Sequence, residues 1–91
     1  MVKDYRSKAR IYSDILESVF SQGLAKPTKI MVDANLSYDR LTKYLSLLLE
    51  KGLVKKYEGS ELSYVITEKG VQYLSEFKKF EKLAAAFGLR L

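Results

Sequence analysis

Apolar residues recur at helical spacing in the first strongly periodic segment of the chain, from about Ser7 to Gln22. An apolar residue at every third or fourth position forms one stripe along a helix, and such a stripe packs against a core. The stripe consists of Ile11, Ile15, Leu16, Val19 and Phe20. Gly23 follows in the position where a left-handed glycine commonly ends a helix. The pattern therefore predicts a first helix between Ser7 and Gly23.

Two further amphipathic segments follow, joined by a very short turn. Thr28 is a good N-cap for a short helix over residues 29–34, and Ser37 is one for a helix over residues 38–51. Between them, Asn35 tolerates the left-handed conformation better than most residues. The residues expected to face inward are Ile30, Met31, Ala34, Leu36, Leu41, Tyr44, Leu45, Leu48 and Leu49. So short a turn forces the helices to cross steeply, which predicts a helix-turn-helix.

After Gly52 the pattern changes from helical to strand-like. Residues 53–58 and residues 62–66 each have the composition of a strand, and Gly59 and Ser60 form the turn between them. The expected inward-facing residues are Leu53, Tyr64 and Ile66, and the expected outward-facing residues are Lys56 and Ser63. An isolated hairpin is barely stable in water, so this one is expected to lean on the helices as a wing.

The last segment has a repeat of a different kind. Thr67 caps a final helix, in which apolar residues alternate steps of four and three. This spacing is a heptad seam, which favours pairing with a second helix. The residues predicted to form a homodimer contact are Tyr73, Phe77, Phe80, Leu83, Ala84, Phe87 and Leu91. The alternative is that the aromatic stripe lines a ligand groove, although no small-molecule ligand is expected.

The order of these elements predicts a mainly helical α+β fold. A winged helix-turn-helix domain of three helices and a β-hairpin would occupy residues 1–70, and a C-terminal coiled-coil dimerisation helix would occupy residues 71–91. The two parts are expected to form one continuous domain, because 91 residues leave room for only one. So small a domain has a marginal core, and without cysteine it has no disulfide to support it. Oligomerisation is the remaining common source of stability.

Composition then narrows the class of function. The net charge is +5, from 16 basic and 11 acidic residues, which favours a polyanionic partner. The chain has no histidine or cysteine and no glycine-rich phosphate loop, so we expect neither an enzyme nor a metal or cofactor site. No apolar run is long enough to cross a membrane, and residues 1–6 lack the apolar stretch of a signal peptide. A cytoplasmic, nucleoid-associated protein is expected.

The candidate DNA contacts lie mainly on the second helix of the helix-turn-helix, on the face that does not pack into the core. Arg40 is the best candidate for a base edge, because its planar guanidinium can form two hydrogen bonds at once. Ser37 and Tyr38 can donate to phosphate at the start of the helix. The complete predicted set is Lys26, Lys29, Ser37, Tyr38, Arg40, Lys43, Lys55 and Lys56.

Several of these residues also have a purely structural interpretation. Ser37 is first of all a helix cap, and Lys43 lies four residues after Asp39, in the favourable orientation for a surface ion pair. Lys55 and Lys56 can contact phosphates, or can protect an exposed strand edge against aggregation. Both interpretations stay open.

Five segments in this order and spacing resemble one protein family. They are Thr28-Lys29-Ile30-Met31, Ala34-Asn35-Leu36-Ser37, Leu41-Thr42-Lys43-Tyr44-Leu45, Gly52-Leu53-Val54 and Tyr64-Val65-Ile66-Thr67-Glu68-Lys69-Gly70. Over residues 7–91 the chain resembles the small archaeal winged-helix proteins of about ten kilodaltons, chromatin-type DNA binders of Sulfolobus. The resemblance implies a homodimer joined by a C-terminal antiparallel coiled coil. The heptad itself supports pairing but does not give its direction.

The combined prediction is a dimeric protein that binds double-stranded DNA, as a chromatin-type protein or a transcriptional regulator. The recognition helix, at about residues 37–51, would enter the major groove, and the wing at residues 53–66 would lie on the backbone. The alternative is a winged-helix protein-interaction module in a larger assembly, without direct DNA binding. The target sequence, the sign of regulation and any effector stay open.

Overall fold

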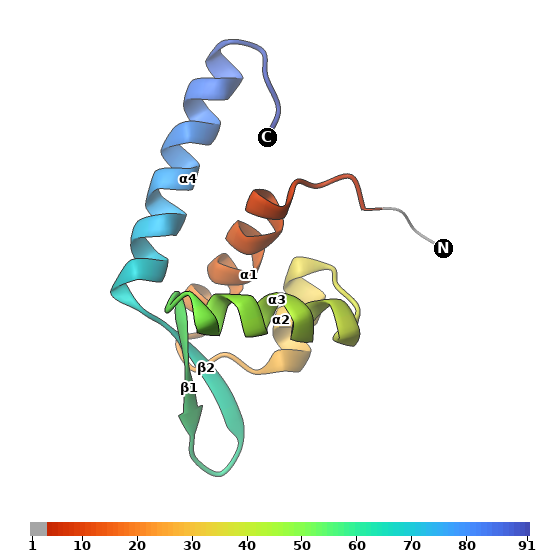
Figure 1. Ribbon diagram of the computed structural model, residues 1–91, viewed down its shortest axis with the longest axis vertical. Coiled ribbons are helices and arrows are strands. Elements are labelled where there is room, and N and C mark those ends of the chain that lie inside the picture. The colour runs from red at the N-terminus through yellow and green to blue at the C-terminus, as the bar shows by residue number, and fades with distance from the viewer. Residues whose placement is uncertain (1–3) are drawn as a thin grey trace.

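The computed structural model describes residues 4–91. The first three residues, which belong to the segment examined for a signal peptide, lie outside the described part. The elements are α1 (Lys8–Gln22), α2 (Pro27–Ala34), α3 (Tyr38–Glu50), β1 (Val54–Glu58), β2 (Leu62–Ile66) and α4 (Glu68–Ala86) (Figure 1). This order confirms the predicted mainly helical α+β fold, a winged helix-turn-helix with a C-terminal helix. Helix α4 begins before the predicted boundary at residue 70 and continues across it.

Short polar side chains cap the start of three of the four helices in the described part of the chain. The hydroxyls of Ser7, Ser37 and Thr67 each accept a hydrogen bond from a backbone N–H in the first turn of α1, α3 and α4. A residue with positive φ follows each of the four described helices: Gly23 after α1 (76°), Asn35 after α2 (53°), Gly52 after α3 (76°) and Gly88 after α4 (73°). The predicted caps at Ser37 and Thr67 and the predicted stops at Gly23, Asn35 and Gly52 are confirmed.

Helix α2 begins differently from the prediction. Its first residue is Pro27, and the N-cap position is taken by Lys26, whose side chain makes no capping hydrogen bond. Thr28 therefore lies inside the first turn and is not the cap. The physical reason is that proline fixes φ near the helical value and lacks the N–H that would be unsatisfied at this position.

The core lies between the helix-turn-helix, α1 and the wing. Its fully buried members include Ile15 and Leu16 of α1, Ile30 of α2 and Leu41 of α3. The prediction for Phe20 was wrong, because this side chain is 55% exposed. It lies in the last turn of α1 and is rotated by about 100° from the fully buried Val19.

The wing is an antiparallel hairpin whose second strand, β2, is hydrogen-bonded along both of its edges. Tyr64 of β2 pairs with Lys56 of β1, and across the other edge of β2 it exchanges two backbone hydrogen bonds of 2.8 Å with Ala25. Because β2 lies between β1 and Ala25 and also contacts α1, Ser63 is buried, which corrects its predicted outward position. The hairpin is therefore anchored to the helical body along β2.

The first inward-facing residue of the wing also differs from the prediction. Val54 pairs with Ile66 and is 2% exposed, whereas Leu53 precedes the strand and is half-buried. Residues paired across an antiparallel ladder lie on the same face of the sheet. The pairing of Lys56 with Tyr64 therefore places this lysine on the face that was predicted to point inward, although its side chain is exposed.

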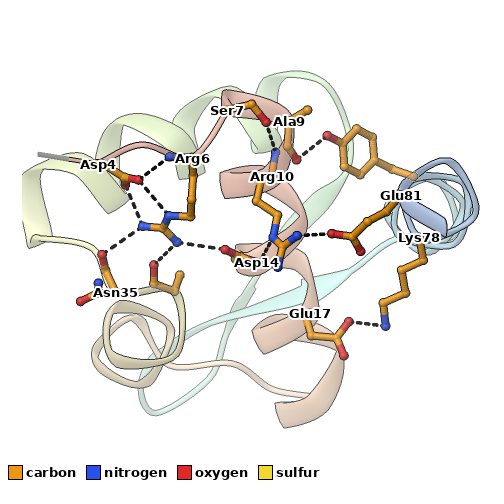
Figure 2. Close-up of polar contacts among 12 residues, drawn as sticks. Asp4, Arg6, Ser7, Ala9, Arg10, Asp14, Glu17, Asn35, Lys78 and Glu81 are labelled. Carbon is orange, nitrogen blue, oxygen red and sulfur yellow. Dashed lines mark hydrogen bonds and ion pairs between the residues drawn. The ribbon is translucent and has the colours of Figure 1, made fainter. Parts of the chain in front are cut away.

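Helix α4 packs along α1 and divides the predicted heptad between two faces. Phe77 and Ala84 are buried within the single chain, and the Tyr73 hydroxyl donates to the Ala9 carbonyl oxygen of α1. Ion pairs from Arg10 to Glu81 and from Lys78 to Glu17 link the same two helices (Figure 2). The structure thus corrects the prediction of one continuous seam, because α1 already covers part of it.

The remaining residues of the predicted seam face solvent. Phe80, Leu83 and Phe87 are 57%, 56% and 75% exposed, and we call these three residues the outer stripe of α4. Leu91 lies beyond the end of the helix, at a surface hollow beside the N-terminal segment. Figure 1 shows the last turns of α4 reaching beyond the rest of the molecule, so the outer stripe lies on its most projecting part.

Candidate nucleic-acid interface

One face of α3 is free of packing within the chain. Leu41, Leu45 and Leu48 are buried against the core, and the opposite face is exposed. The exposed residues in the first two turns are Tyr38, Asp39, Thr42 and Lys43, with Arg40 half-buried beside them. Ser37 is occupied as the cap, since its hydroxyl accepts from the Arg40 backbone N–H at 3.3 Å.

Asp39 and Lys43, whose spacing would allow a surface ion pair as the alternative role of this lysine, are not paired in the described part of the chain. Lys43 is exposed and lies one turn after the start of α3. The interpretation of this lysine as the partner of a neighbouring aspartate is therefore not supported. Its charge is presented to solvent on the same side of α3 as Asp39.

Arg40 is held in place by two neighbours. Its Nη2 lies 3.0 Å from an Asp4 carboxylate oxygen, and its guanidinium carbon lies 5.8 Å from the centre of the Tyr44 ring. The second contact has the geometry of a cation–π interaction. Tyr44 and then Asp4 raise the pKa of Arg40 above its ordinary value, so the side chain stays charged.

The N-terminal segment is fastened to the turn of the helix-turn-helix, which sequence reasoning did not foresee. Figure 2 shows Arg6 between Asp4, Asp14 and the end of α2. Its guanidinium donates to Asp14 at 2.9 Å and to the carbonyl oxygens of Ala34 and Asn35 at 2.6 and 3.2 Å. These carbonyls belong to the C-terminal end of α2, where backbone acceptors have no partner in the helix and a positive charge is favourable.

The wing faces α3 across a groove of about 150 Å³. Lys56 lies on its wing side, and Tyr38 and Ser46 lie on its α3 side. Lys55 pairs with Val65, one residue out of step with Lys56, so it lies on the other face of the hairpin. The two lysines were predicted as one group, but only Lys56 shares the groove with the exposed face of α3.

The two flanking lysines are each paired with a carboxylate. Lys26 forms an ion pair with Glu61 at the tip of the wing, and Lys29 forms one of 3.0 Å with Asp33 in the next turn of α2. Exposed pairs of this kind contribute little to stability, so a phosphate can compete for either lysine. The tip itself carries Glu58 and Glu61, which would repel phosphate if it approached closely.

Other kinds of site find no support in the described part of the chain. Among residues 4–91 there is no group of three or more acidic side chains placed to hold a metal ion. None of the described helices combines the length and the apolar composition that crossing a membrane requires.

Comparison with known proteins identifies the family to which this fold belongs. A family model described as winged helix-turn-helix matches residues 5–85. Sso10a-2, described as a DNA-binding protein from Sulfolobus solfataricus, is similar over 90% of this chain and 85% of its own, with 25% sequence identity and a TM-score of 0.80. No curated protein sequence matches the chain significantly.

Two bacterial regulators share the fold at lower identity. The transcriptional regulator Tm0710 from Thermotoga maritima is 21% identical over 89% of this chain, with a TM-score of 0.64. ZitR, a zinc-responsive MarR family member from Lactococcus lactis, is 18% identical over 97%, with a TM-score of 0.69. The chain spans 61% and 64% of their lengths. The family match and the similarity to Sso10a-2 confirm the resemblance seen in the sequence, and the chain belongs to the winged helix-turn-helix family.

Proposed function

We propose that this protein binds double-stranded DNA as a homodimer, with α3 in the major groove and the wing on the backbone. The observation that carries the proposal is that the exposed side of α3 presents Lys43 and the half-buried Arg40, while Tyr38 and Lys56 line the adjoining groove. A helix presented in this way fits the major groove, and cations beside it fit the flanking phosphates. The net charge of +5 supports a polyanionic partner.

The similar proteins support the same role. Sso10a-2 is described as DNA-binding, and two of the other similar proteins are described as a transcriptional regulator and a MarR family member. For this chain we propose a non-enzymatic role on the nucleoid in the cytoplasm, either as a chromatin-type protein or as a regulator of transcription. Discrete protected sites on genomic DNA would favour a regulator, and uniform protection would favour a chromatin protein.

The outer stripe of α4 is the proposed dimer contact. Phe80, Leu83 and Phe87 are large, apolar and exposed at spacings of three and four residues. Such a stripe on one helix matches the same stripe on a second copy, as a two-fold interface requires. Tyr73, Phe77 and Ala84 would support it from within each protomer, because they fix α4 against α1. A dimer would carry two α3 helices and could contact two segments of one duplex.

A salt titration tests the DNA-binding proposal directly. We expect the affinity for a mixed-sequence duplex, measured by fluorescence anisotropy, to fall steeply with salt, because cations on the protein displace counterions from phosphates. If about six to ten phosphates are neutralised, the loss between about 50 and 200 mM salt should be roughly a thousandfold or more. Absence of binding at low salt would contradict the proposal and favour a protein-interaction module.

The two wing lysines give a sharper test of how the duplex is held. Lys56→Ala should lower the slope of log affinity against log salt by about 0.9, the value for one lost phosphate contact. Lys55→Ala, which removes the same charge from the other face of the hairpin, should change the slope much less. Equal slopes for both variants and the natural chain would mean that the wing does not touch DNA.

A further inference from the structure

Asp4 lies between two guanidinium groups at the start of α3. One carboxylate oxygen accepts from the Arg6 backbone N–H at 2.9 Å and from Arg6 Nε at 3.0 Å. The other lies 2.8 Å from Arg6 Nη2 and 3.0 Å from Arg40 Nη2. The carboxylate therefore connects the N-terminal segment to the side chain that is the best candidate for reading a base.

This carboxylate does not move freely. Arg6, which holds it through three N–H groups, is itself fixed by Asp14 and by the carbonyl oxygens at the end of α2. The Asp4 side chain is 15% exposed, whereas that of Arg40 is 39% exposed. The hydrogen bonds from Arg6, and after them the one from Arg40, lower the pKa of Asp4 far below its ordinary value, so it is ionised at any physiological pH. Asp4 is thus a rigid, permanently charged support behind Arg40.

Such a support has opposite consequences for phosphate binding and for base reading. A negative charge beside Arg40 weakens the attraction of that arginine for phosphate. It also restricts a long, flexible side chain, and the Tyr44 ring restricts it further. Reading a base needs the guanidinium in one plane and one direction, whereas phosphate contact does not. The contact with Asp4 engages Nη2, and an arginine carries further N–H donors with which to meet a base.

We propose that Asp4 is a positioning residue that orients Arg40 for base recognition, and so sets the sequence preference of the protein. The inference rests on the proposed DNA-binding function and adds to it a residue outside the recognition helix. Asp4 does not itself contact DNA. It lowers the general affinity for duplex and raises the discrimination between sequences.

The test compares Asp4→Asn with the natural chain on two readouts. Sequence preference is measured by selecting duplexes from a random library, then taking the ratio of affinities for a selected and a scrambled duplex. For Asp4→Asn we expect this ratio to fall at least about fivefold, the lower end of what one bidentate base contact contributes. Affinity for the scrambled duplex should rise, and its salt slope should steepen by up to about 0.9, because the freed Arg40 can pair with a phosphate.

Asp39→Asn is the matched control, since it removes an identical charge from the first turn of α3. Asp39 is exposed and is not among the groups that hold Arg40. This control should raise the affinity for both duplexes and leave their ratio unchanged. Equal changes of the ratio in the two variants would overturn the proposal, because charge alone would then explain them.

A second comparison separates positioning from a general structural role. In an Arg40→Ala background, Asp4→Asn should have no further effect on the ratio of affinities. If Asp4→Asn acted only by loosening the N-terminal segment, it would change the ratio in both backgrounds. A natural chain that binds duplex without any sequence preference would overturn the inference and leave the proposed function intact. A chain that does not bind duplex at low salt would remove the proposed function itself.

Discussion

Gly70→Ala should lower the thermal unfolding midpoint by roughly 8–16 °C. A Cβ atom at this position would lie 2.2 Å from the Leu53 carbonyl oxygen and 2.7 Å from the Cγ1 atom of Ile66. Overpacking of this kind costs about 1–3 kcal/mol and occasionally more. In a domain of this size, each kcal/mol shifts the midpoint by about 4–8 °C. Alanine gains about 1 kcal/mol of helix propensity over glycine, so a clash at the upper end of this range leaves a net loss of about 2 kcal/mol, or roughly 8–16 °C.

The clash at Gly70 cannot be relieved by a small side-chain movement. The nearest atom belongs to the backbone of Leu53, whose N–H donates to Leu48 at the end of α3 and whose carbonyl oxygen accepts from the Thr67 N–H. Moving it would disturb the junction at which α3, the wing and α4 meet. The whole of α4 would therefore have to shift, and with it the outer stripe.

Gly59→Ala is the control for this prediction. Its added Cβ would meet only the side chain of Tyr57, at 3.2 Å, in the exposed turn of the wing. We expect the midpoint of this variant, measured by circular dichroism, to stay within a few degrees of the natural value. If Gly70→Ala unfolds at the natural temperature as well, the close approach of α4 to Leu53 is not a constraint on the fold.

The elements that could be predicted from the sequence are those fixed by neighbouring residues. The cap at Ser37 and the left-handed Asn35 depend on the hydrogen bonds of one helical turn, and both are present as expected. The predicted start of α2 is wrong because Thr28 is a good cap, but Pro27 one residue earlier is the stronger signal for the first position of a helix. Helix caps and stops depend on residues that are neighbours in the chain, so a single sequence is enough to predict them.

Long-range pairing is what the sequence did not reveal. Arg6 bonds to the Ala34 carbonyl oxygen, 28 residues away, and nothing in the composition of the N-terminal segment indicates this partner. Asp4 was for the same reason absent from the predicted site, although it holds the most important of the predicted contacts. An alternation of acidic and basic residues shows that ion pairs can form, but not with which element.

The heptad of α4 illustrates a second limit. A repeat of four and three predicts that the helix is covered, but does not say by what. The structure shows that α1 covers Phe77, whereas Phe80, three residues later and rotated by about 60°, faces solvent. A sequence repeat cannot distinguish a partner in the same chain from a partner in another chain.

The outer stripe gives the second prediction with a large effect. Fully burying a large apolar side chain contributes about 1.5–3 kcal/mol, and a two-fold contact through Phe80, Leu83 and Phe87 would bury six of them. Association itself costs free energy, so the proposed dimer depends on burying most of this apolar surface. An interface of this kind should not tolerate charge at its centre.

We therefore expect the double variant Phe80→Glu with Leu83→Glu to be monomeric by analytical ultracentrifugation. Four carboxylates would meet in the contact, and burying an unpaired charge is strongly unfavourable. On a duplex long enough for both recognition helices, the affinity should also fall by about 10²–10⁴, because two linked contacts become one. The circular dichroism spectrum should be unchanged, since both side chains are exposed in the single chain.

Ser75→Glu controls for the added charge, because Ser75 is exposed on α4 and lies outside the outer stripe. It should remain dimeric and lose little affinity beyond the effect of one extra negative charge near DNA. The two readouts distinguish the parts of the proposal. A double variant that is still dimeric would place the interface elsewhere on the molecule. A double variant that is monomeric but binds the long duplex as tightly as the natural chain would mean that one winged helix suffices for binding, so that the dimer serves to join separate DNA segments.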